Sequence, residues 1–161
     1  MPLIRDIAPD DYPVVEELLN STDLGDGMSY EPGGLDVVVA ELQGHLVGVA
    51  EFELHCDFGH DEGREAHPRE QTFIYTMAVA PTDRRGGVGQ ALLPEIALRA
   101  QEAGDTFLAL VPQDGAEEAG RQAFFQACGL TLYGPDRPGA AWGCPVSEIL
   151  AVKGTADAAG E

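Results

Sequence analysis

Short apolar stretches bounded by turn residues predict four strands in the first half of the chain. The first is "LIRDI" (3–7), in which apolar and polar residues alternate. Two runs rich in β-branched residues, "LDVVVAEL" and "HLVGVAEFEL", are separated by "QG" and predict a hairpin between Leu35 and Leu54. A further run, "QTFIYTMAVAP" (71–81), predicts a strand that ends at Pro81, because proline cannot donate a hydrogen bond to a sheet.

Helical spacing of apolar residues predicts a helix directly after the first strand. The helix follows Asp10 and Asp11, which suit its N-cap. Its apolar positions are Val14, Val15, Leu18 and Leu19. The segment 21–34 that comes next is dense in turn residues and acidic residues, and it therefore predicts a surface loop.

Between residues 87 and 103 the apolar positions recur at intervals of four, which predicts a long amphipathic helix. These positions are Val88, Leu92, Ile96 and Ala100. Gly104 follows as a C-terminal stop. Pro94 lies inside this helix, and we expect it to bend the helix because it removes one backbone hydrogen bond.

The last third of the chain predicts three more strands and one helix. "TFLALVP" (106–112) has the composition of a buried strand, and "GAEEAGRQAFFQACG" (115–129) predicts a helix that ends at its final glycine. "LTLY" and "SEILAV" predict two closing strands, joined by the loop "GPDRPGAAWGCP" (134–145). The resulting order of elements predicts a mixed α/β fold, with a largely antiparallel sheet flanked by helices.

Length and composition predict one globular domain over residues 1–153, followed by a disordered tail at 154–161. The chain has 161 residues, of which 44% are hydrophobic and 23% charged. No apolar run approaches the roughly 20 residues of a membrane span, and the start lacks the pattern of a signal peptide. We therefore expect a cytoplasmic protein. Its three cysteines form no CxxC pair and are expected to be reduced thiols.

The charge is strongly negative, at -19, with 28 acidic residues against nine basic ones. Such a surface repels a phosphate backbone, so we expect neither nucleic acid nor a membrane as a partner. Two interpretations of the acidity remain open. It could steer a cationic substrate to its site, or it could serve solubility or adaptation to salt.

One short basic segment, "DRRGGVGQALL" (83–93), interrupts this acidic chain between a predicted strand and a predicted helix. The first turn of a helix presents unpaired N–H groups and the positive end of the helix dipole, which together favour an anion. Glycines let the backbone approach such a ligand closely. An ordinary helix N-terminus stays the alternative. The Walker and dinucleotide-binding fingerprints both fail here, because their lysine and glycine spacings are missing.

The spacing that does fit is R-x-x-G-x-G, as Arg84, Gly87 and Gly89, preceded by "MAVAP" and followed by "QALL". This segment closely resembles the coenzyme A motif of the GNAT superfamily of N-acetyltransferases. The later "FFQACGL" is similar to that family's second motif. The resemblance covers nearly the whole chain. It implies a GNAT-like acyl-CoA N-acyltransferase fold, acetyl-CoA (coenzyme A) as the cofactor, and transfer of an acetyl group to a primary amine in a ternary complex.

The resemblance also implies where the cofactor binds. The backbone of Met77, Ala78 and Val79 would meet the pantetheine and the thioester, with the Val79 amide facing the thioester oxygen as acyl transfer requires. The pyrophosphate would be held at the basic turn and the first turn of the helix. The residues implied there are Arg84, Arg85, Gly86, Gly87, Val88, Gly89 and Gln90.

The catalytic base is less clearly marked. A primary amine is mostly protonated at neutral pH, so it needs a group that takes a proton. The family often places this group on the strand before the turn, where this chain has Phe73 and Tyr75. Tyrosine there is expected to act as a hydrogen-bonding partner. Glu51 and Glu53 on the neighbouring strand, or Glu70, are substitutes, although each taken alone could be a solvated strand residue.

The second motif departs from the family at the proton donor for the leaving thiolate. Phe125 stands where many members have a tyrosine, and Glu118 replaces a common asparagine. Water or Tyr133 could protonate the thiolate instead. The alternative function is a catalytically weak or inactive coenzyme A-binding module with a regulatory or sensing role.

Two further groups of residues are candidates. The polar loop 55–70 contains possible metal ligands, but their spacing matches no closed structural site, so we predict a solvated loop and no metal. These residues are His55, Cys56, Asp57, His60, Asp61, Glu62 and His67. The acceptor side is expected to include Asp23, Asp26, Glu31, Trp142 and Cys144. We therefore expect a small-molecule amine, cationic in character, as the acceptor, and a homodimer stays open.

Overall fold

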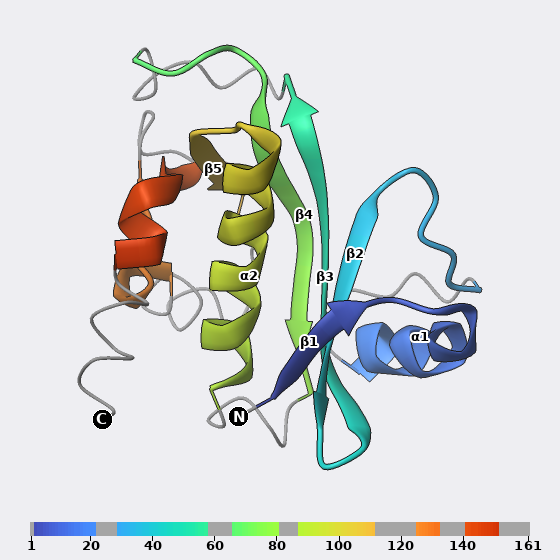
Figure 1. The fold of residues 1–161 in the computed structure, drawn as a ribbon. Helices are drawn as coiled ribbons and strands as arrows, with labels where there is room; N and C mark the ends of the chain where they lie inside the picture. The colour runs from blue at the N-terminus through green and yellow to red at the C-terminus, as the bar shows by residue number, and fades with distance from the viewer. Residues whose placement is uncertain are drawn as a thin grey trace. The chain divides into compact units, whose positions relative to one another are not determined.

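The computed structural model describes residues 2–21, 29–57, 66–80, 87–111, 125–132 and 141–151, and it has a mixed α/β fold. Its elements are β1 (Leu3–Asp6), the 3-10 helix η1 (Pro9–Asp11), α1 (Tyr12–Ser21), β2 (Asp36–Leu42), β3 (His45–Cys56), β4 (Gln71–Val79), α2 (Val88–Ala103), β5 (Phe107–Leu110), β6 (Thr131–Leu132) and β7 (Trp142–Pro145) (Figure 1). Residues 146–151 are also helical. Among the helices that are described, none has the length and apolar character to cross a membrane.

The chain divides into two compact units, and β3 and β4 run through both of them. The first unit comprises Met1–Phe52 and Tyr75–Glu95, and the second comprises Glu53–Ile74 and Ile96–Glu161. Hydrogen-bonded strands follow the order β1-β2-β3-β4 in the first unit and β3-β4-β5-β7-β6 in the second.

The first unit contains the predicted hairpin. β2 pairs with β3 in antiparallel register, with Val39 opposite Val49. Gln43 and Gly44 form the turn between them with φ values of 53° and 81°. Positive φ at both central residues is the conformation of a type I′ turn, whose twist matches that of the paired strands. The prediction of a hairpin from the β-branched runs is therefore confirmed.

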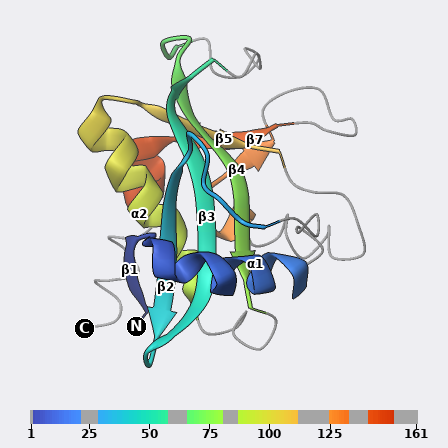
Figure 2. The same cartoon turned by 90° about the vertical axis from the view of Figure 1, so that its right-hand side faces the viewer.

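Helix α1 covers one face of this unit's strands (Figure 2). Three of its four predicted apolar positions are buried in one cluster with strand residues, whereas Val14 is 43% exposed. The cluster consists of Val15, Leu18, Leu19, Val37, Val39, Val49 and Ala78. Since neighbouring residues of a strand face opposite sides, Val49 faces α1 and Gly48 faces the other side.

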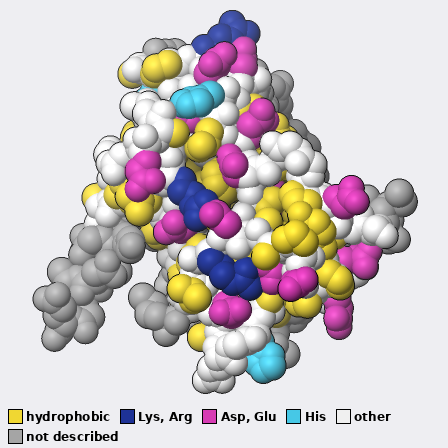
Figure 3. Space-filling model, turned by 45° about the vertical axis from the view of Figure 1, so that its right-hand side comes forward, with side chains coloured by type: hydrophobic (Ala, Val, Ile, Leu, Met, Phe, Trp, Pro, Cys, Tyr) yellow, Lys and Arg dark blue, Asp and Glu magenta, His cyan; other side chains and the backbone are white. Residues whose placement is uncertain are grey.

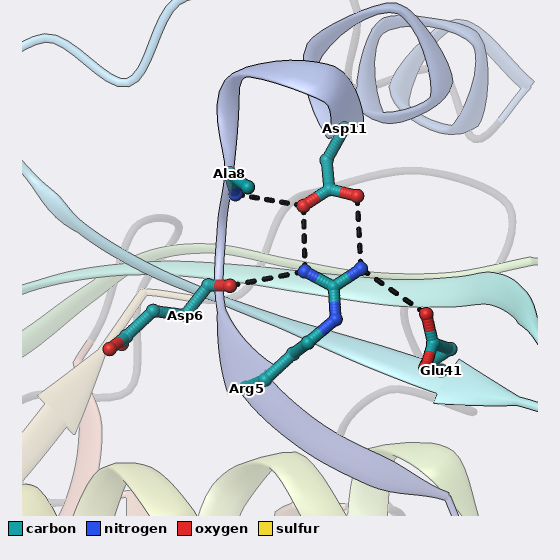
Figure 4. A network of polar contacts seen from close by, with 5 residues as sticks. All are labelled: Arg5, Asp6, Ala8, Asp11 and Glu41. Atoms are coloured by element: carbon teal, nitrogen blue, oxygen red, sulfur yellow. Dashed lines mark hydrogen bonds and ion pairs between the residues drawn. The ribbon is translucent and has the colours of Figure 1, made fainter.

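Arg5 on β1 joins the strand edge to the start of α1 (Figure 4). Its two terminal nitrogens donate to Asp11 at 2.7 and 3.0 Å, and one of them also reaches Glu41 at 3.3 Å. Asp11 accepts a third bond from the backbone N–H of Ala8 at 2.8 Å. The guanidinium of Arg5 is the main cause that lowers the pKa of the Asp11 carboxyl, and the Ala8 amide lowers it further.

This network predicts a loss of stability in acid. A carboxyl whose pKa is lowered by folding stabilises the native state above its unfolded pKa of about 4, and this contribution is lost as the pH falls through the folded value. The difference in free energy of unfolding between the wild-type chain and Asp11→Asn should therefore be largest above about pH 4 and should shrink below it. Urea unfolding at a series of pH values measures this difference. A difference that stays constant down to pH 2 would contradict the expectation.

The second unit ends differently from the prediction. β7 spans Trp142–Pro145, within the predicted loop, and pairs antiparallel with both β5 and β6. Residues 146–151 are helical, so the predicted closing strand "SEILAV" is wrong. Val146 and Ile149 are buried while the two residues between them are exposed, which is helical spacing.

A buried carboxylate, Asp105, holds three elements of the second unit together. Its side chain is 3% exposed and accepts bonds from the backbone N–H of His55 at 2.9 Å and from the Thr72 hydroxyl at 2.8 Å. The Nδ1 atom of His55 lies 2.6 Å from its other oxygen. Both His55 and Cys56 belong to the end of β3, so the prediction that they lie in the polar loop is wrong.

Candidate functional site

The N-terminus of α2 offers backbone donors to a ligand. Gly87 precedes the helix with φ of 79°, a conformation that glycine adopts far more readily than other residues. Its carbonyl accepts the first helical bond, from the N–H of Ala91 at 3.0 Å. The N–H groups of Val88, Gly89 and Gln90 consequently have no acceptor inside the helix. These donors lie at the positive end of the helix dipole and suit a phosphate group.

This helix start is held tightly against β3. A side chain on Gly48 would place its Cβ 2.8 Å from Cγ1 of Val88 and 3.2 Å from Cδ1 of Leu92. Both of these helix residues are fully buried. Because Val88 is β-branched and stiff, it cannot move aside easily. Glycine at position 48 therefore allows the close approach that fixes the first turn of α2 on the strand.

The end of β4 places the amide of Val79 away from β3. The two strands run in opposite directions (Figure 1), and the N–H of Ala80 donates to the carbonyl of Val47 at 2.8 Å. Successive N–H groups of an extended strand point to opposite sides, so the preceding N–H, that of Val79, points away from β3. In the second unit the ladder between β4 and β5 is registered over Thr72–Ile74.

The described residues fit the chemistry of coenzyme A. An extended strand backbone at Met77–Val79 belongs to the same unit as the amides at the start of α2 that have no acceptor inside the helix. Both supply N–H donors, which a pantetheine chain and a pyrophosphate require. The predicted residues Arg84, Arg85 and Gly86 lie outside the described residues.

Glu51 is a half-buried carboxylate on β3, in the same unit. The hydroxyl of Tyr30 donates to its Oε2 atom at 3.0 Å. The Tyr30 ring packs edge-on against Tyr12, with the centroids 5.9 Å apart. Burial is the main cause that raises the pKa of Tyr30 well above its usual range, and the neighbouring charge of Glu51 raises it further. No signal in the sequence marked Tyr30, which lies in the turn-rich segment after α1.

The other predicted catalytic residues are distributed over both units. Tyr75 on β4 belongs to the first unit, where it is 50% exposed. Glu53 lies near the end of β3 in the second unit and is half-buried. Glu70 is exposed just before β4. The structure thus brings Glu51 and Tyr30 together as a pair and describes Tyr75 and Glu53 in the strands where the sequence placed them.

Two residues that were expected to line the acceptor side lie in a strand, so their prediction as loop residues is wrong. Trp142 and Cys144 belong to β7 and are buried, with exposures of 7% and 3%. Phe125 is buried as well. Burial raises the pKa of the Cys128 thiol to about 11, and burial together with the charge of Glu148 raises that of Cys144 to about 12. Both thiols are therefore protonated at neutral pH and are poor nucleophiles.

The polar loop between β3 and β4 is described only in part. Where residues are described, no three His, Cys, Asp or Glu side chains come together as a metal site. His67 contacts the hydroxyl of Thr106 at 2.9 Å through Nδ1. Glu31 is exposed. Several residues named from the sequence lie outside the described residues: Asp23, Asp26, His60, Asp61, Glu62, Glu118 and Tyr133.

Comparison with solved structures shows the fold. A GNAT-family putative acetyltransferase from Desulfovibrio desulfuricans matches with a TM-score of 0.66 at 20% identity, over 91% of this chain and 99% of that one. The ribosomal-protein-S18-alanine N-acetyltransferase of Escherichia coli matches with a TM-score of 0.65 at 16% identity, over 91% and 94%. The IAA acetyltransferase of Bacillus cereus matches with a TM-score of 0.63 at 17% identity, over 90% and 99%.

Sequence comparison identifies the family. No curated protein sequence matches the chain. The family model described as an acetyltransferase (GNAT) domain matches residues 33–130, more than half of the chain. This span includes β4, the glycine-rich segment 83–93 and α2, which contain the candidate cofactor site. The chain therefore belongs to the GNAT family of acetyltransferases.

Proposed function

We propose that this chain is an acetyl-CoA dependent N-acetyltransferase that acetylates a primary amine of a small cationic molecule by direct transfer in a ternary complex. The observation that carries the proposal is the set of three amides at the start of α2 that have no acceptor inside the helix, in the same unit as the Val79 amide. Acetyl-coenzyme A supplies the acetyl group as a thioester, so that a C–N bond to the amine replaces the C–S bond and the sulfur takes up one amine proton.

In this proposal the cofactor is held by backbone groups and by the two arginines. The amides of Val88, Gly89 and Gln90 bind the pyrophosphate, with Arg84 and Arg85 supplying positive charge. The N–H of Val79 stabilises negative charge on the thioester oxygen. Its orientation away from β3 supports this role, because it leaves the donor outside the ladder between β3 and β4.

A cationic acceptor is supported by the charge of the chain. Acidic side chains are spread over the face seen in Figure 3, whereas arginine side chains occur at few places on it. Glu51 has no basic partner among the described residues. A half-buried carboxylate without a basic partner among the described residues, in a chain of net charge -19, attracts an ammonium group. Glu51 is therefore the first candidate for the base, with Tyr75 as a hydrogen-bonding residue and Glu53 as a second carboxylate.

The phenylalanine in the second motif bears on the alternative function. Phe125 cannot donate a proton to the departing sulfur, and it is buried. Water or Tyr133 takes that role if the chain is an enzyme. If neither does, the chain is a coenzyme A-binding module without turnover, because cofactor binding needs no proton donor.

Calorimetry with coenzyme A tests the proposal. We expect binding in the micromolar range and at least a tenfold loss of affinity in the double variant Arg84→Ala and Arg85→Ala, since two charge-assisted phosphate contacts are removed. Release of free thiol with spermidine, lysine and an aminoglycoside as amines then measures turnover. If the wild-type chain does not bind coenzyme A, the proposal is wrong. Tight binding with no thiol release would favour the coenzyme A-binding module without turnover.

A further inference from the structure

The register of the first unit places Glu51 close to the end of β4. The bond from Ala80 to Val47 sets these residues opposite each other in antiparallel strands. In the same register Val49 lies opposite Ala78, and both residues belong to the core cluster under α1. Two residues further, Glu51 lies opposite Thr76. Measured along β3, Glu51 therefore lies about 7 Å from Val49, the residue opposite Ala78.

A tyrosine from a distant part of the sequence controls how this carboxylate lies. Tyr30 is half-buried against the same core cluster, and its hydroxyl donates to one oxygen of Glu51. Its ring is further fixed by the edge-on contact with Tyr12 at the start of α1. Among the described residues, this is the one hydrogen bond that Glu51 accepts. A carboxylate has about four lone-pair sites, so the bond orients the group and leaves its other oxygen for a ligand.

We propose that Tyr30 is a positioning residue for the acetyl-transfer reaction, which aims the free oxygen of Glu51 at the ammonium group of the acceptor. This inference rests on the proposed function. Glu51 takes one proton from the ammonium group and releases it to water after transfer, while the Tyr30 hydroxyl keeps its own proton throughout. The amine is thereby left with a free electron pair for attack on the acetyl carbon.

The hydroxyl and the ring of Tyr30 have separate roles and can be tested separately. Tyr30→Phe keeps the ring and its contact with Tyr12 but removes the donor to Glu51. Glu51→Gln removes the charge that accepts the proton. Tyr12→Phe is the matched control, because Tyr12 also loses a hydroxyl but has no hydrogen bond to Glu51.

The decisive experiment is a double-mutant cycle on thiol release with spermidine, lysine and an aminoglycoside as the amines. We expect Tyr30→Phe to lower kcat for the best of these amines about tenfold and Glu51→Gln about 100-fold, with the KM for acetyl-coenzyme A unchanged. Because Tyr30 acts through Glu51, Tyr30→Phe should cause little further loss in the Glu51→Gln background. Tyr12→Phe should retain the wild-type kcat.

The outcomes separate this inference from the proposed function. Additive losses in the cycle, or an unchanged kcat in Tyr30→Phe, would overturn the role of Tyr30 and leave an acetyltransferase. A wild-type chain that acetylates none of the three amines would overturn both. A second measurement needs no cofactor. It monitors the ionisation of the tyrosines by ultraviolet absorbance as the pH is raised. In Glu51→Gln the Tyr30 phenol should ionise at lower pH than in the wild type, and an unchanged profile would show that the contact is not made in solution.

Discussion

Replacing Asp105 by alanine is expected to lower the free energy of unfolding by about 3 kcal/mol. The side chain is 3% exposed and accepts the N–H of His55 and the hydroxyl of Thr72, so that its loss leaves the buried Thr72 hydroxyl and the partly buried His55 amide without an acceptor. Water cannot easily replace it at a site so deeply buried. Urea unfolding followed by circular dichroism measures the effect.

A second carboxylate serves as the control for this prediction. Asp57 follows β3 directly and pairs with Arg69 at the surface, where ion pairs stabilise proteins by about 0–1 kcal/mol. Asp57→Ala should therefore change the free energy of unfolding far less than Asp105→Ala. Asp105→Asn keeps the shape and one acceptor oxygen for the His55 amide and the Thr72 hydroxyl but loses the charge, so an intermediate loss of the free energy of unfolding is expected. Equal losses in Asp57→Ala and Asp105→Ala would contradict the role of Asp105.

Replacing Gly87 by valine is expected to reduce the affinity for coenzyme A at least tenfold. A β-branched residue is strained at the positive φ of 79° that Gly87 adopts before α2. Relief of that strain would rotate the carbonyl that accepts the first helical bond and would displace the amides of the first turn, which have no acceptor inside the helix. Calorimetric titration with coenzyme A measures the loss.

The matched variant is Gly87→Asn, because asparagine tolerates positive φ better than other non-glycine residues. Space is not limiting at this position, since a Cβ on Gly87 would have no atom within 4 Å. Asparagine should therefore retain most of the affinity that valine loses. Equal affinities of the wild type and Gly87→Val would show that the conformation of this residue is not needed for binding.

Periodicity was sufficient to predict the elements that bury one face. The intervals of four in α2 correspond to four fully buried residues, and the β-branched runs form the hairpin. The same reasoning failed at β7, because Gly143 and Pro145 weaken the strand pattern. Gly143 is required there for a reason that only the fold shows. A Cβ on this residue would lie 2.5 Å from the carbonyl oxygen of Leu108 on the paired strand.

The candidate site was predictable to the extent that it follows from contiguous residues. The segment 83–93 follows the end of β4 closely in sequence, so a cofactor site there could be predicted from the motif. Tyr30 could not, because its contact with Glu51 joins residues 21 positions apart through the packing of α1 and β2 on β3. A tyrosine in a segment rich in glycine and acidic residues carries no local pattern that distinguishes it.

Strand β3 carries both the contact with the start of α2, at Gly48, and the proposed base, Glu51. Gly48 contacts the helix start that is proposed to hold the pyrophosphate, and Glu51 on the same strand is the proposed proton acceptor. Three residues of extended chain separate them by about 10 Å. Gly48 faces α2 whereas Glu51, like Val49, faces α1, so β3 sets the spacing of the two sites along the strand and places them on opposite faces of it. Substitutions around Glu51 that change the preferred acceptor would therefore leave the spacing along β3 unchanged.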